Sequence, residues 1–142
     1  MNIPFSPPDI SEREIEEVIA ALKSGWITTG PKTKELESKI SSYCGTEKTV
    51  CLSAATTALE MTLRLLGVGK GDEVIVPAYT YTATCSVICH VGATPVMVDS
   101  QKDKEEMDYT LMSEAISDKT KVIIPVDIAG ILCDYGRIFE IM

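Results

Sequence analysis

Apolar residues in the first 45 positions of this chain recur with the spacing of one helix face. The run at i, i+3, i+4 and i+7 consists of Ile15, Val18, Ile19 and Leu22. A capping-box pair, Ser11 and Glu14, precedes the run, and Gly25 follows it where a helix C-terminal glycine belongs. The sequence therefore predicts a helix before Gly25 and a second helix over residues 34–43.

Beyond residue 45, short continuous apolar runs alternate with helical patterns. The runs predict buried strands at residues 49–52, 73–76, 95–98 and 121–126. The stretches between them predict helices at residues 56–66 and 82–91. Two further helices are predicted later in the chain, one capped by Thr110 and the other by Asp134. Because the strands are continuously apolar, we predict an α/β fold with a doubly wound, mostly parallel sheet and helices on both faces.

Length and charge narrow the class of protein. The 142 residues suit one domain, which we divide into a helical segment (1–45) and an alternating β/α unit (46–142). The net charge is −8 with no basic patch, so nucleic acid is not an expected partner. The N-terminus has no signal-peptide pattern and no apolar run is long enough for a membrane, so we expect a cytoplasmic protein without a membrane partner.

The cysteines allow two interpretations. There are five, and none forms a CxxC pair. Cys85 and Cys89 lie one helical turn apart, with His90 beside the second, so a metal site can be imagined. Two small apolar residues on a helix face, with a histidine near its end, explain the pattern more simply, and we expect no metal.

A turn of small residues, Ser53 to Thr57, leads from a predicted strand into a predicted helix. A helix N-terminus presents free backbone N–H groups and a partial positive charge, so Ala54, Ala55 and Thr56 can form a phosphate cup. The alternative of equal weight is that Ser53 or Thr56 simply caps the helix. The turn is neither a Walker loop nor a GxGxxG, so a nucleotide fingerprint is not supported.

Two loops are further candidates. The first leaves the carboxyl end of a predicted strand and carries Tyr81, whose ring can lie against a planar heterocycle. Its alternative is that Tyr79 and Tyr81 only pack the loop. The second contains Thr28 and Thr29 before Gly30, which makes a rigid polar loop or a simple connector between helices.

In this order the motifs form a recognisable series. They are G-x-[IL]-[ST]-x-G at 25–30, T-x-A-L at 56–59, G-x-G-D-E-V-[IL]-x-P at 69–77, T-[FYW]-x-A-T at 80–84, G-A-x-P-V-x-V-D at 92–99 and P-V-[HD]-x-x-G-x-x-x-D at 125–134. The chain resembles the pyridoxal-phosphate-dependent sugar aminotransferases of the DegT/StrS type, which have the fold type I architecture. The likeness covers almost the whole chain.

The resemblance assigns roles to matching residues. It implies that pyridoxal 5′-phosphate is the cofactor, with its phosphate near Ala54 and bound by the N–H groups of Ala55 and Thr56 and by the Thr56 hydroxyl. It implies that Tyr81 stacks on the pyridine ring. It places Thr28, Thr29 and Gly30 near the sugar substrate. The family often has Ser, Asn or Gly before the threonine, so the two alanines here put a side-chain donor in doubt but leave the backbone donors.

The family's reaction moves an amino group from an amino acid, glutamate being the expected donor, to a nucleotide-linked keto-sugar, in an active site built between two subunits of a homodimer. Its Schiff-base lysine and its pyridine-binding aspartate have no match before Met142. Asp127 falls on the family's [HD] position instead. We therefore expect an incomplete large domain that is inactive alone and contains no catalytic residue.

Two alternatives stay open. Some relatives use a histidine in place of the lysine and dehydrate the sugar. A truncated, non-catalytic α/β module would instead self-associate through its exposed sheet edge and helix faces.

Overall fold

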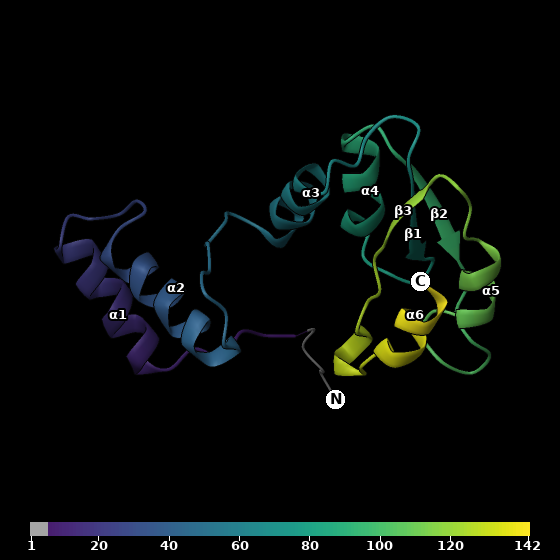
Figure 1. Ribbon diagram of the computed structural model, residues 1–142. Helices are drawn as coiled ribbons and strands as arrows, with labels where there is room; N and C mark the ends of the chain where they lie inside the picture. The colour runs from purple at the N-terminus through teal and green to yellow at the C-terminus, as the bar shows by residue number, and fades with distance from the viewer. Residues whose placement is uncertain (1–5) are drawn as a thin grey trace. The chain divides into compact units, whose positions relative to one another are not determined.

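A computed structural model describes residues 6–142 of the chain. It contains two compact units, which divide between Cys51 and Leu52, and Figure 1 shows the helices and strands of each. No helix among the described residues combines the length and the apolar character needed to cross a membrane.

The first unit is a pair of helices, α1 (Glu12–Lys23) and α2 (Pro31–Cys44). The capping box is formed as predicted. The Ser11 side chain accepts a backbone N–H of the first turn, and the Glu14 carboxylate accepts the Ser11 N–H. Gly25 has φ +74°, which confirms the C-terminal glycine. The second helix begins three residues earlier than predicted, because the ring of Pro31 already has a helical φ and the first helical position needs no N–H donor.

The second unit is built on a three-stranded parallel sheet of β1 (Glu73–Pro77), β2 (Thr94–Val98) and β3 (Thr120–Ile123). The strand order is β2-β1-β3, so β1 is the central strand. Its residues Val74, Ile75 and Val76 are fully buried, because β1 is covered on both faces. Burial on both faces explains the continuous apolar run and confirms the predicted parallel sheet.

Helices cover both faces of this sheet. On one face α3 (Ala55–Leu65) and α4 (Ala83–His90) pack through Leu63, Val87 and Ile88 against Val74 and Val76. On the other face lie α5 (Tyr109–Glu114) and α6 (Tyr135–Ile141). Their core residues Met112 and Ile138 pack with Ile75. The doubly wound architecture is therefore as predicted.

The predicted strand at residues 49–52 is wrong. The segment belongs to none of the strands that the structure describes, and its Val50 is 70% exposed. Two polar side chains of α2 hold it instead: Glu37 accepts the Cys51 N–H at 2.8 Å, and Ser41 bonds the Thr49 hydroxyl at 2.8 Å. An apolar run becomes a strand only where a neighbouring strand can pair with it.

The boundary of β3 is also corrected, since this strand ends at Ile123 rather than at residue 126. The Ile124 N–H still donates to the Ile75 carbonyl at 2.9 Å, so the backbone hydrogen-bonding groups of Ile75 point toward β3. Two residues later β1 has Pro77 on the same side, and a proline nitrogen has no hydrogen to donate. The ladder therefore ends there.

The cap of α5 is corrected too. The carboxylate of Asp108, not the Thr110 hydroxyl, caps this helix by accepting the N–H groups of Thr110 (2.8 Å) and Leu111 (3.1 Å). Asp134 caps α6 as predicted and accepts the Arg137 N–H at 3.0 Å.

Candidate functional site

The loops that follow β1 and β3 meet at the carboxyl edge of the sheet. They line a hollow of about 280 Å³ with Tyr79, Thr80, Tyr81 and Ile128. The Tyr81 side chain is 80% exposed and Tyr79 is 59% exposed. The alternative that these two rings serve only to pack the loop is therefore not supported, and the Tyr81 ring is free to contact a ligand.

Two threonines fix the backbone around Tyr81. The hydroxyls of Thr80 and Thr84 are 2.9 Å apart, and the Thr84 N–H donates to the Tyr81 carbonyl at 3.0 Å. Thr84 is 6% exposed, so its hydroxyl needs this partner. The two threonines of T-[FYW]-x-A-T are thus spaced so that their hydroxyls bond each other across the start of α4. The aromatic residue of the motif lies between them in the sequence.

The N-terminus of α3 has no side-chain cap. Its N-cap residue is Ala54, and the Thr57 and Ala58 N–H groups both donate to the Ala54 carbonyl. The N–H groups of Ala55 and Thr56 come before this first intrahelical bond and so have no acceptor within the helix. The alternative that Ser53 or Thr56 caps the helix is wrong, and two backbone donors are left beside the Thr56 hydroxyl.

The α-helices of residues 6–142 divide evenly by this criterion. Those with a side-chain cap are α1, α5 and α6, capped by Ser11, Asp108 and Asp134. The helices α2, α3 and α4 have none, and their N-cap residues are Gly30, Ala54 and Thr82. Each uncapped N-terminus thus lies at or beside residues that the sequence assigned to the site. In α2 the first residue is a proline, so one donor is absent from the start.

The start of α3 and the Tyr81 loop lie toward the same edge of the sheet. Gly67, just past the end of α3, accepts a hydrogen bond from the Lys121 ammonium at the start of β3, at 2.6 Å. Since α3 ends where the strands begin, it starts toward their carboxyl ends, as Figure 1 also shows. In open α/β sheets this is the side on which ligands bind.

Asp127 follows β3 but is committed to its own loop. One carboxylate oxygen accepts the Cys133 N–H at 2.9 Å and the other accepts the Tyr135 hydroxyl at 3.0 Å. The bond from the Cys133 N–H is the main reason that the pKa of Asp127 is lowered, and the bond to Asp127 raises the pKa of Tyr135. Asp127 therefore stays ionised as a clamp on residues 127–135.

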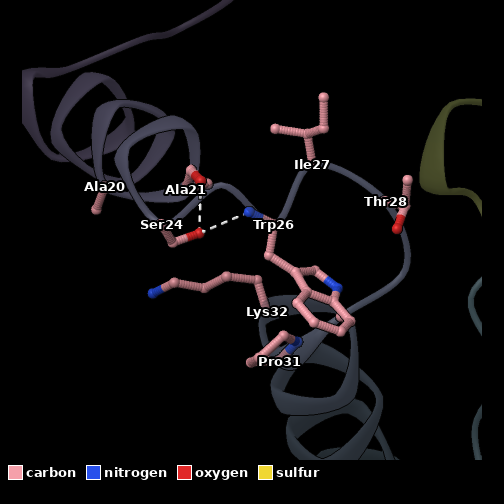
Figure 2. A pocket seen from close by; sticks show the side chains of 9 residues that line it. Ala20, Ala21, Ser24, Trp26, Ile27, Thr28, Pro31 and Lys32 are labelled. Atoms are coloured by element: carbon pink, nitrogen blue, oxygen red, sulfur yellow. Dashed lines mark hydrogen bonds between the residues drawn. The ribbon is translucent and has the colours of Figure 1, made fainter.

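The loop between α1 and α2 borders a separate open hollow of about 340 Å³, shown in Figure 2. Two of the three predicted substrate residues, Thr28 and Gly30, line it, whereas Thr29 does not. The Thr29 carbonyl instead accepts the indole N–H of Trp26 at 2.9 Å. The sequence reasoning missed Trp26, although it is the only tryptophan of the chain and lies inside the motif.

The cysteine and histidine cluster of α4 has a structural explanation. His90 Nδ1 lies 3.0 Å from the Glu60 carboxylate of α3. Burial raises the pKa of the Cys85 thiol. No three Cys, His, Asp or Glu side chains within residues 6–142 come together as metal ligands.

Comparison with known proteins matches the chain to one family. A sequence profile of the DegT/DnrJ/EryC1/StrS aminotransferase family matches residues 8–142. The chain is 42% identical over 98% of its length to a protein of Shewanella sediminis named UDP-4-amino-4-deoxy-L-arabinose–oxoglutarate aminotransferase. It spans 36% of the length of that relative.

Solved structures give the same result. Spr1654 from Streptococcus pneumoniae, which bears the name of a sugar aminotransferase, is 70% identical over 99% of the chain, with a TM-score of 0.94. Its structure has been determined in PLP and PMP forms. An aminotransferase from Psychrobacter cryohalolentis is 31% identical over 97% of the chain, with a TM-score of 0.89. The chain covers 36% of each of these structures.

The profile match over nearly the whole chain and the shared architecture lead to one conclusion: this chain belongs to the DegT/DnrJ/EryC1/StrS aminotransferase family.

Proposed function

We propose that the carboxyl edge of residues 52–142 holds the phosphate and one ring face of pyridoxal 5′-phosphate. The single observation that carries the proposal is the uncapped start of α3, where the N–H groups of Ala55 and Thr56 remain for an anion. Ala54, at the N-cap, has a side chain too small to fill that space. The Tyr81 ring, exposed at the strand-end hollow, supplies the flat contact.

This donor set fits the cofactor. A phosphate needs several donors and a positive field, which the helix N-terminus and the Thr56 hydroxyl supply although the net charge of the chain is −8. When bound, the cofactor carries the amino group between donor and acceptor. The residues of this chain bind its phosphate, set the tilt of its ring and keep water from the covered ring face.

We propose that the reaction is transfer of an amino group from glutamate to a nucleotide-linked keto-sugar. The names of the relatives support this choice, because one is a UDP-sugar–oxoglutarate aminotransferase and another is named for a sugar substrate. The dehydratase of the same family would use the same phosphate cup, so product analysis distinguishes the two. A cytoplasmic homodimer remains the expected form.

We further propose that the chain alone binds the cofactor without turnover. None of the ten lysines lines the strand-end hollow. Lys104, whose neighbouring hollow shares Ile128, is paired with Glu106 at 3.0 Å. A lysine that bonds the cofactor is therefore not among the residues at this edge.

Calorimetric titration of the purified chain with pyridoxine 5′-phosphate tests the proposal. This probe lacks the aldehyde and cannot react with lysines, so it reports the cup alone. We expect Thr56→Val and Tyr81→Ala each to weaken binding about tenfold. The matched control is Tyr43→Ala, since Tyr43 is 90% exposed on α2. Equal affinity for Tyr81→Ala and the unchanged chain would contradict the proposed role of the ring, and equal affinity for pyridoxine without phosphate would contradict the cup.

A further inference from the structure

Trp26 closes the loop between α1 and α2 with its own side chain. The indole N–H donates to the Thr29 carbonyl at 2.9 Å, three residues along the chain. At its backbone, the Trp26 N–H donates to the Ser24 hydroxyl at 3.1 Å, and that hydroxyl donates to the Ala21 carbonyl of α1 at 2.6 Å (Figure 2). Thr28 thus lies in a segment fixed on both sides by Trp26.

Gly30 shows how tightly the indole fits. Its φ and ψ are both −155°, an extended conformation that any residue adopts, so the backbone does not require glycine there. A Cβ at Gly30 would overlap Cδ1 and Nε1 of the Trp26 ring. Glycine is required because the indole occupies the space of a side chain, and Gly30 is the one buried residue of 6–51.

Core packing does not account for this arrangement. Trp26 is 57% exposed, so burial stabilises its ring far less than a core aromatic. The only hydrogen-bond donor of the indole, its N–H, bonds to the loop itself. Its contacts therefore shape residues 26–30 rather than join helices.

We propose that Trp26 is a positioning residue that holds Thr28 and Thr29 in the conformation that meets the hydroxyl-rich sugar part of the substrate. This inference rests on the proposed transfer to a nucleotide-linked keto-sugar and on the family resemblance, which places Thr28, Thr29 and Gly30 near that sugar. Trp26 and Gly30 act together. The indole ring fixes the conformation of the loop, and the absence of a Cβ at Gly30 leaves space for the ring.

The test is a double-mutant cycle of Gly30→Ala and Trp26→Leu, read by ¹⁵N relaxation at Thr28 and Thr29 and by the single indole N–H resonance. We expect Gly30→Ala to displace the indole, to abolish the protected indole N–H and to increase mobility at both threonines. In the Trp26→Leu background the clash is absent, so Gly30→Ala adds less than about a twofold further change in any binding constant. Trp26→Phe keeps an aromatic ring but loses the indole N–H and the five-membered ring beside Gly30, so both threonines should also become more mobile.

Titration with UDP-glucose gives the second readout. The unchanged chain binds it, Gly30→Ala and Trp26→Leu weaken it by about fivefold or more, and the double variant is no weaker than Trp26→Leu within about twofold. Additive effects of the two substitutions on loop mobility and binding would overturn the positioning role while leaving the proposed function intact. An ordered, coupled loop in a chain that does not bind UDP-glucose would overturn the sugar assignment on which the inference rests.

Discussion

The strand ends of residues 52–142 and the loop of residues 24–31 are held in place by different interactions. Tyr81 follows β1, whose central residues are fully buried between helices on both sides. Thr28 lies between two helices whose large apolar side chains are all at least 40% exposed, and local hydrogen bonds and one glycine fix it. The backbone around Tyr81 is thus positioned by the core of its own unit, whereas the loop of residues 24–31 is positioned by contacts within the loop itself.

The largest expected effect separates these two sources of order. Ile75→Ala removes a fully buried side chain of β1 and should lower the free energy of unfolding by about 2–5 kcal/mol. Ile19→Ala on α1, 43% exposed, should cost less than about 1 kcal/mol. Urea denaturation measures both. Equal losses would contradict the account that a buried core holds β1 but not α1.

A smaller effect is expected at the hydroxyl pair beside Tyr81. Thr84→Val keeps the shape and removes the hydroxyl, so it should lower the free energy of unfolding by about 1–2 kcal/mol. It should also weaken pyridoxine 5′-phosphate binding, and that weakening should disappear in a Tyr81→Ala background if Thr84 acts through the ring. Thr84→Ser retains the bond and serves as the control, with exposed Thr110→Val as a second. Persistence of the effect without Tyr81 would contradict the account.

Adding a side-chain cap to α3 should raise the free energy of unfolding and weaken binding of the phosphate probe. Ala54→Asp gives the Ala55 and Thr56 end of the helix a carboxylate acceptor and should raise the free energy of unfolding by about 0.5–2 kcal/mol without ligand. The same carboxylate repels phosphate, so probe affinity should fall by about tenfold. Ser11→Ala removes the cap of α1 and should lower stability without changing affinity. A stabilised Ala54→Asp chain with unchanged affinity would show that phosphate binds elsewhere.

The smallest effect concerns pH. The pKa of Asp127 is lowered in the folded chain, chiefly by the Cys133 N–H, so its contribution to stability is present above the unfolded pKa and is lost as the pH falls through the lower, folded value. Asp127→Asn should therefore lose less stability than the unchanged chain between about pH 5 and pH 2. Acid titrations followed by circular dichroism compare the two. Identical acid transitions would mean that the clamp contributes nothing to stability.

Local pattern predicted most of the fold. Residues 74–77 are apolar throughout because β1 is buried on both faces, and Ser11 and Asp134 cap helices where their spacing indicates. The segment 49–52 carries a similar run, yet only the presence of a pairing partner decides whether it is a strand. Asp108 and Thr110 are both good caps two residues apart, and only the backbone selects between them.

The site was less accessible to sequence reasoning. Ser53 and Thr56 are both residues that cap helices, so the free start of α3 could be recognised only once Ala54 was placed at the N-cap. The role of Trp26 depends on a carbonyl three residues away and on a side chain that is absent at Gly30. Contacts of this kind leave no periodic signal in the sequence.

The central claim is that the start of α3 and the Tyr81 loop together hold the cofactor phosphate and ring. Mapping of ¹⁵N amide chemical shifts on the purified chain during titration with pyridoxine 5′-phosphate tests it most directly. We predict that the largest saturable shifts fall on Ala55, Thr56 and Tyr81. Shifts that are largest at the capped starts of α1, α5 or α6, or that never saturate, would contradict the claim.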